Sequence, residues 1–237
     1  MSDTVISAIT DLPRTTVTDG VDLYREIHKG LRHALFDVTF RAGRLDVSDD
    51  ESIVGLLAES RQVVDLLRGH HQHEEQLLLE GLIEAHASAA VGPIHDEHRL
   101  LSERLDRFAA RADELAAAAT DARSAIAHEY YLELAAFTAA YLVHLDVEER
   151  VVMPALAAAC DDAELGRVQG AILASIRPEQ QAVGLTMMLP ALNPVERAAM
   201  VGRIRMTAPH EGFARVQKIA AHVLTAVEYE RLGITDV

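Results

Sequence analysis

The stretch HHQHEEQLLLEGL, residues His70 to Leu82, decides how this chain folds. It places three histidines and two glutamates directly before a run of leucines. A solvated surface does not need the leucines, and a hydrophobic core does not accept ionisable groups unless a partner compensates them. The stretch therefore indicates a polar site that is buried next to something able to stabilise it.

The same pattern occurs twice in the chain. A histidine is followed four residues later by a pair of glutamates and then by apolar residues, first at His70 and again at His144. A further histidine precedes each copy, at His28 and at His98. A step of four residues along an α-helix rises about 6 Å and turns by only about 40°. Each histidine of the pattern therefore shares one helix face with the glutamate that follows it.

The apolar residues of nearly every long segment recur at helical spacing, and no segment alternates as a strand does. Ser48 to Glu51 combine a capping side chain with acids, which is typical of a helix start. Gly92 and Pro93 break the next segment, and Pro93 can open a new helix. The expected helices are roughly 21–42, one that starts within 48–51 and runs to about 87, one from residue 93, and about 122–159. With short connections they predict an all-α protein, an antiparallel up-down four-helix bundle.

The remainder of the chain is expected to be a C-terminal helical extension. The predicted division is therefore a bundle over residues 1–160 and an extension over residues 161–237. Pro178, Pro190 and Pro194 are expected to cut the extension into short helices. It holds only His210 and His222 of the 12 histidines, so no clustered ligands are expected there.

Bringing these histidines and glutamates together favours a metal site. Helices of a bundle lie roughly 8–10 Å apart, so inward side chains from four helices can converge on one small cavity. Imidazole nitrogen together with carboxylate oxygen suits iron, manganese or zinc. Each buried ionisable group without a partner would cost several kcal/mol, against a total stability of about 5–15 kcal/mol. A bound cation is the simplest compensation.

The arrangement of histidines and H-x-x-x-E pairs resembles the hemerythrin-like (HHE cation-binding) proteins over about residues 20 to 158. The resemblance implies a four-helix bundle that holds a non-haem di-iron centre, two iron ions with an oxo or hydroxo bridge. Its second pair is H-x-x-x-E rather than the H-x-x-x-x-D of oxygen carriers, which favours the broader bacterial branch. Glu74 and Glu148 match the bridging carboxylates. The full implied ligand set is His28, His70, Glu74, His98, His144 and Glu148.

Four more residues are candidates for a further ligand or for a group that hydrogen-bonds a ligand: His71, Glu75, His95 and Tyr141. His71 competes with His70, because it pairs with a glutamate at the same spacing. His95 lies one turn before His98 on the expected helix. Tyr141 also fits a purely structural place in the core.

The resemblance implies a protein that binds small diatomic or peroxide ligands. The leading hypothesis is binding and processing of hydrogen peroxide, nitric oxide or O2, with peroxidase-like or catalase-like activity. The alternative is a non-catalytic protein that binds or senses O2, nitric oxide or iron. A histidine proton switch would need no metal. A zinc hydrolase fits less well, because zinc prefers four ligands.

The composition excludes several other partners. The formal net charge of −15 argues against nucleic acid and against anionic membranes. No apolar run approaches the roughly 18 residues of a transmembrane helix. The first residues lack a basic region before an apolar core, so no secretory signal is predicted. The single cysteine, Cys160, suits a reducing cytoplasm. A cytoplasmic monomer or homodimer is expected.

Overall fold

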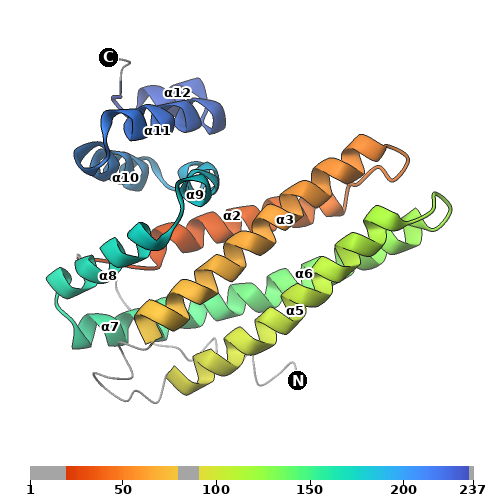
Figure 1. The fold of residues 1–237 in the computed structure, drawn as a ribbon, viewed down its shortest axis with the longest axis horizontal. Helices are drawn as coiled ribbons and strands as arrows, with labels where there is room; N and C mark the ends of the chain where they lie inside the picture. Colours follow the sequence, from red (N-terminus) through yellow and green to blue (C-terminus); the bar gives the residue numbers. More distant parts are fainter. Residues whose placement is uncertain (1–19, 80–90, 235–237) are drawn as a thin grey trace. The chain divides into compact units, whose positions relative to one another are not determined.

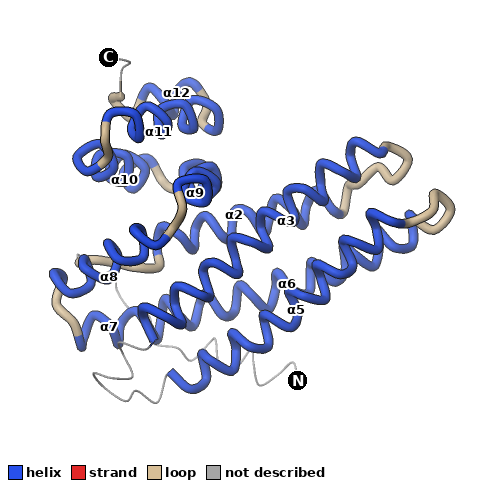
Figure 2. The backbone as a smooth tube through the Cα atoms, in the orientation of Figure 1, coloured by secondary structure: helices blue, strands red, loops and turns tan. Residues whose placement is uncertain are grey.

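The structure is a computed structural model that describes residues 20–79 and 91–234. These residues are helical with short connections and contain no strand (Figures 1 and 2), so the all-α prediction is confirmed. The chain divides into two compact units. Of the described residues, the first unit comprises 20–24, 35–79 and 91–172, and the second comprises 25–34 and 173–234. No helix in the described parts of the chain is long and apolar enough to cross a membrane.

The first unit is built on long helices. Helix α5 packs beside both α3 and α6, and it runs opposite to each of them (Figure 1). The hydroxyl groups of Thr39 in α2 and Thr138 in α6 lie 3.0 Å apart. The elements of the first unit are the later part of α2 (Arg25–Ala42), α3 (Asp50–His73), η1 (Glu74–Leu79), α5 (Val91–Ala117), α6 (Arg123–Val147), η2 (Glu148–Val152), α7 (Met153–Ala159) and most of α8 (Asp162–Ser175).

Interactions between neighbouring residues explain at which residues the helices begin. Helix α2 begins at Arg25 rather than at residue 21, because the Asp22 carboxylate accepts the Tyr24 N–H at 3.0 Å and holds a turn there. Helix α3 begins at Asp50, inside the predicted start region of residues 48–51, with Asp49 as its N-cap. Helix α5 begins two residues before Pro93, which lies within its first turn. The predicted end of the second helix, near residue 87, lies outside the described residues.

The second unit contains the short C-terminal helices α9 (Pro178–Ala191), α10 (Pro194–Thr207), α11 (His210–Val223) and α12 (Ala226–Glu230). Pro178 and Pro194 each open a helix, so both divide the extension as predicted. The prediction for Pro190 was wrong: it lies inside α9, where the helix ends one residue later in any case. The buried guanidinium of Arg197 donates to the carbonyl oxygens of Leu189 and Leu192, at 2.7 and 2.8 Å. It thereby satisfies carbonyl groups that the end of α9 leaves unpaired.

The early part of α2 packs closely within this second unit. Lys29 donates to Glu196 of α10 at 2.6 Å. A Cβ atom added to Gly30 would lie 2.7 Å from the side chain of Met188, so glycine allows α2 and α9 to approach each other. The C-terminal helices therefore pack on a segment of their own chain.

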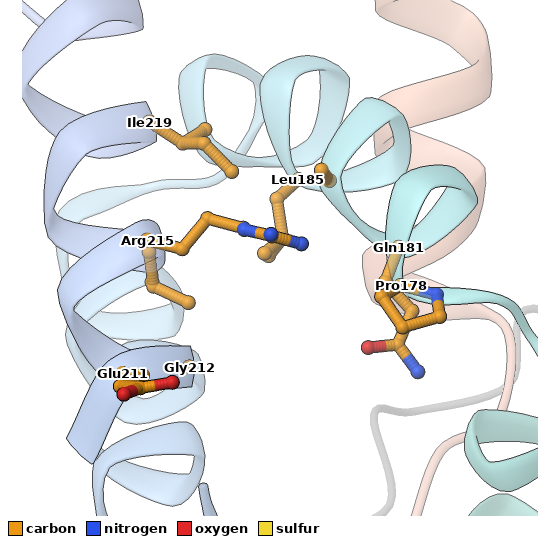
Figure 3. A pocket seen from close by; sticks show the side chains of 9 residues that line it. Pro178, Gln181, Leu185, Glu211, Gly212, Arg215 and Ile219 are labelled. Atoms are coloured by element: carbon orange, nitrogen blue, oxygen red, sulfur yellow. The ribbon is translucent and has the colours of Figure 1, made fainter. Parts of the chain in front are cut away.

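A groove of about 270 Å³ lies between α9 and α11. Figure 3 shows the Arg215 side chain extending from α11 toward Leu185 of α9, with Gln181 and Glu211 nearby. Aliphatic side chains make up most of the rest of its lining. This groove is a feature of the C-terminal unit alone and contains none of the clustered histidines.

Candidate metal centre

The candidate ligands continue the apolar stripes of their own helices. In α3 the buried residues recur at three-residue and four-residue steps through Leu67 to His71. In α6 the corresponding stripe runs through Phe137 and Tyr141 to His144. The stripes therefore carry polar side chains into the core at one end of the first unit. The buried polar residues placed in this way are His71, Glu74, His98, His144 and Glu148.

Both glutamates of the repeated motif begin a π-helical segment. Glu74 opens η1 and Glu148 opens η2, where the sequence predicted an uninterrupted α-helix. The N–H of Met153 bonds to the carbonyl oxygen of Glu148, five residues back. Pro154, which follows, has no N–H to continue the α-helical ladder. Segments of π-helix are rare and occur frequently at functional sites.

Two imidazole nitrogens and two carboxylates converge in the core. The Nε2 atoms of His98 and His144 lie 3.1 Å apart. Oε1 of Glu148 lies 3.4 and 3.2 Å from these two nitrogens, and Oε2 of Glu74 lies 3.4 Å from that of His98. Two ligand atoms about 2.1 Å from one ion and at right angles to each other are about 3.0 Å apart. The spacing of these four groups therefore fits the ligands of a single metal ion.

The other ring nitrogens of these two histidines are held by carboxylates. Nδ1 of His98 lies 2.7 Å from Oε1 of Glu75, and Nδ1 of His144 lies 3.0 Å from Oε2 of Glu97. When each Nδ1–H donates to its carboxylate, the Nε2 atom of each histidine presents a lone pair to the Nε2 atom of the other histidine. A cation or a proton must then lie between them. Carboxylates in this position orient histidines that bind metals.

Glu97 was not predicted from the sequence. It immediately precedes His98, and its partner is the histidine of another helix, His144. No local signal distinguishes it from Asp96, which is exposed. Glu75, by contrast, was among the predicted candidates.

His71 lies face to face with two other rings. Its imidazole stacks on His98 at 4.5 Å and on Tyr141 at 5.4 Å between ring centroids. Both ring nitrogens are buried without a hydrogen-bond partner among the described residues. A nitrogen of His71, one of His98 and one of His144 lie within 4.8 Å of one another. Such buried nitrogens without partners fit a centre that receives a metal or a ligand.

The structure supports His70 and His28 as metal ligands to different degrees. Nε2 of His70 lies 3.1 Å from Oε1 of Glu74, and its side chain is only 8 % exposed, so His70 belongs to the same buried group. His28 is fully buried in α2. It lies in Arg25–Ala34, which is part of the second unit, so its role as a ligand remains a prediction.

The remaining candidates lie around the cluster. His95 is partly exposed and pairs with Glu75 at 2.6 Å, so it contacts the carboxylate that holds His98. The Tyr141 hydroxyl is buried without a hydrogen-bond partner among the described residues. Burial and the nearby carboxylates of Glu74 and Glu148 raise its pKa well above the usual value.

Tyr24 was not predicted as part of the site. It is buried in the first unit, and burial together with the carboxylates of Glu74 and Glu148 raises its pKa well above the usual value. The sequence offers no signal for it, because it precedes α2 and belongs to no motif.

The protonation of the cluster follows from burial and from the close carboxylates. Burial, followed by the charge of Glu148, raises the pKa of Glu74 to about 8. Burial lowers the pKa of His71 to about 3. Burial also opposes the charging of His98 and His144, but their carboxylate partners outweigh it and raise these pKa values to about 10 and about 9. Without a metal, the native cluster therefore retains protons.

The metal-free protein is expected to lose stability as the pH rises from about 6.5 to 9. The folded-state pKa values of Glu74, His98 and His144 lie above their ordinary values, so the unfolded chain binds fewer protons in this range. The lowered pKa of His71 acts in the opposite direction, but only below pH 6.5. We expect the free energy of unfolding, measured by urea denaturation, to fall by more than about 1 kcal/mol.

The control for this pH dependence is His144→Gln, which cannot titrate and should show a smaller decrease. A free energy of unfolding that increases with pH over this range would contradict the proposed protonation of the cluster.

The family model of the hemerythrin HHE cation binding domain matches residues 19–156. Because this match covers more than half of the sequence, the chain belongs to the hemerythrin HHE cation-binding family, as the resemblance predicted. No curated protein and no solved structure matches the chain. Family membership and the buried cluster of histidines and glutamates both indicate metal binding.

Proposed function

We propose that this protein holds two iron ions and uses them to bind and process small oxidants. The observation that carries the proposal is the convergence of the His98 and His144 Nε2 atoms on buried Glu74 and Glu148. Both Nδ1 atoms are occupied by carboxylates, so the Nε2 lone pairs face each other and are placed to bind a cation.

The proposed ligands divide between two ion positions. His98 and His144 would hold one ion and His70 would hold the other, while His28 stays a predicted ligand from the sequence. Glu74 and Glu148 would supply the carboxylates shared by the two ions, because each lies against histidines of the cluster. His70 supports this division, because its Nε2 lies against the Glu74 oxygen that does not face His98. These six side chains leave coordination positions for exogenous ligands.

The proposed reaction is catalase-like. Two molecules of hydrogen peroxide give two of water and one of O2, so no external reductant is needed. The iron pair would supply the electron-accepting and electron-donating steps. The chain's own residues hold the imidazoles in place through Glu75 and Glu97. We extend the proposal to nitric oxide and O2 as ligands, and to a cytoplasmic role against oxidative stress.

Non-catalytic binding or sensing of O2, nitric oxide or iron is the alternative function. The pairing of Glu75 and Glu97 favours it, because each of these carboxylates beside the cluster already contacts a histidine. Neither is therefore a free acid that can serve turnover.

Elemental analysis of the purified protein, together with its visible spectrum and its consumption of peroxide, tests the proposal. We expect iron at about two ions per chain, as in other di-iron bundles, and consumption of many equivalents of peroxide. Consumption of a single equivalent would favour the binding protein. Zinc alone, or no metal after reconstitution with iron, would refute the proposed function.

A further inference from the structure

A polar pocket of about 400 Å³ lies directly against the cluster in the first unit. Among the residues that line it are His71, Gln72, Glu75, His95, Arg99 and Ser102. Gln72, Arg99 and Ser102 are exposed, whereas His71 and the adjacent His98 are buried. Among the described residues, the lining therefore leads from the surface of α3 and α5 to the candidate metal ligands.

His71 forms the inner wall of this pocket. Its ring is fixed by stacking on His98 and Tyr141, and it is only 6 % exposed. Neither ring nitrogen has a hydrogen-bond partner among the described residues. Leaving such a group unpaired costs free energy, so a hydrogen-bonding molecule in the pocket would recover part of it.

We propose that the polar pocket is the site through which the centre receives hydrogen peroxide, with His71 as the residue that hydrogen-bonds it there. The inference rests on the proposed function and specifies which of its small ligands the site favours. Hydrogen peroxide both donates and accepts hydrogen bonds, and a neutral imidazole does the same. O2 and nitric oxide gain little from such a lining, and a polar pocket retains water that competes with them.

The charges around the pocket favour a neutral ligand over an anion. Arg99 already pairs with Glu103 at 2.9 Å, and Arg68, which also lines the pocket, pairs with Asp106 at 2.6 Å. His95 is engaged by Glu75. With its cationic side chains paired, the pocket offers hydrogen-bonding groups rather than a free positive charge.

Blocking the pocket tests whether ligands pass through it. Ser102→Trp places a large side chain at an exposed lining position of α5, and Arg104→Trp is the matched control. Residue 104 is also exposed, about 200° further around the helix. In the iron-loaded protein we expect Ser102→Trp to slow peroxide consumption and the binding of azide, followed by its charge-transfer band, by at least about tenfold. Arg104→Trp should react at the wild-type rate.

Removing hydrogen-bonding groups tests the preference for peroxide. Gln72→Leu should slow the reaction with peroxide by about fivefold, the loss of roughly one hydrogen bond, while leaving the rate of nitric oxide binding unchanged. His71→Phe keeps the ring stacking but removes both nitrogens. It should retain iron and lose peroxide reactivity.

The outcomes separate this inference from the proposed function. Wild-type protein that binds no iron would overturn both. Normal iron content with wild-type peroxide and azide rates in Ser102→Trp would overturn the inference alone. Equal slowing of peroxide and nitric oxide in Gln72→Leu would overturn the preference for peroxide. Loss of iron in His71→Phe would make His71 a metal ligand instead.

Discussion

The His144→Ala protein is expected to purify with little iron and without the visible absorption of the wild type. The Nε2 atom of His144 lies 3.1 Å from that of His98 and 3.2 Å from Glu148, at the centre of the buried cluster. Loss of an outer partner of a ligand already costs about 10–100-fold in metal affinity, so we expect loss of the ligand itself to cost more than about 100-fold. Elemental analysis measures the loss of iron, and visible spectroscopy measures the loss of absorption.

The matched control is His128→Ala. His128 lies on the same helix, α6, but is exposed, so its replacement should change neither iron content nor absorption. Because an alanine at residue 144 leaves a cavity, His144→Gln tests the same ligand at nearly constant volume. Circular dichroism of each variant reports whether the helices remain folded. Equal iron retention in the variants at positions 144 and 128 would exclude His144 as a ligand.

Iron is expected to raise the melting temperature of the protein strongly. In the metal-free state Glu74 and Glu148 are buried close together, and this raises the pKa of Glu74 to about 8. A cation that binds only the folded state compensates these buried carboxylates. Free iron at about 1,000 times its Kd would stabilise the protein by about 4 kcal/mol. For a chain of this length the shift is on the order of 10 °C. Calorimetry under anaerobic conditions, with and without ferrous iron, measures it.

Magnesium is the control for this shift. It requires octahedral coordination by oxygen and is bound poorly by imidazole, so the same concentration should leave the melting temperature unchanged. A metal-free protein that folds fully and gains nothing from iron would favour the histidine proton switch. His144→Ala should show a reduced shift, which ties the stabilisation to the cluster.

The sequence alone predicted the all-α fold and most helix boundaries. The start of α3 near residues 48–51 and Pro194 as the first residue of α10 follow from rules that involve only neighbouring residues. The prediction for Pro190 was wrong, because the effect of a proline on a helix depends on where that helix ends, and α9 ends one residue after Pro190. The π-helical turns were not predicted either, since the spacing of apolar residues does not mark a turn with one additional residue.

The candidate site was predicted in part. The repeated motif placed His70 and Glu74 one turn apart, and they lie 3.1 Å apart in the structure. His71 was only an alternative, although the buried stripe through Leu67 leads to it. Glu97 was missed because its partner lies on a different helix.

The class of fold and the residue types of the site could be predicted from the sequence, because helical periodicity and the H-x-x-x-E step are local properties of one helix. Only the tertiary structure decided that Glu75 and Glu97 hold the Nδ1 atoms of His98 and His144, so that the Nε2 atoms face each other. It also decided that His71 lies between the cluster and the polar pocket. These contacts depend on the rotation and register of packed helices, which the whole core sets and no single segment specifies.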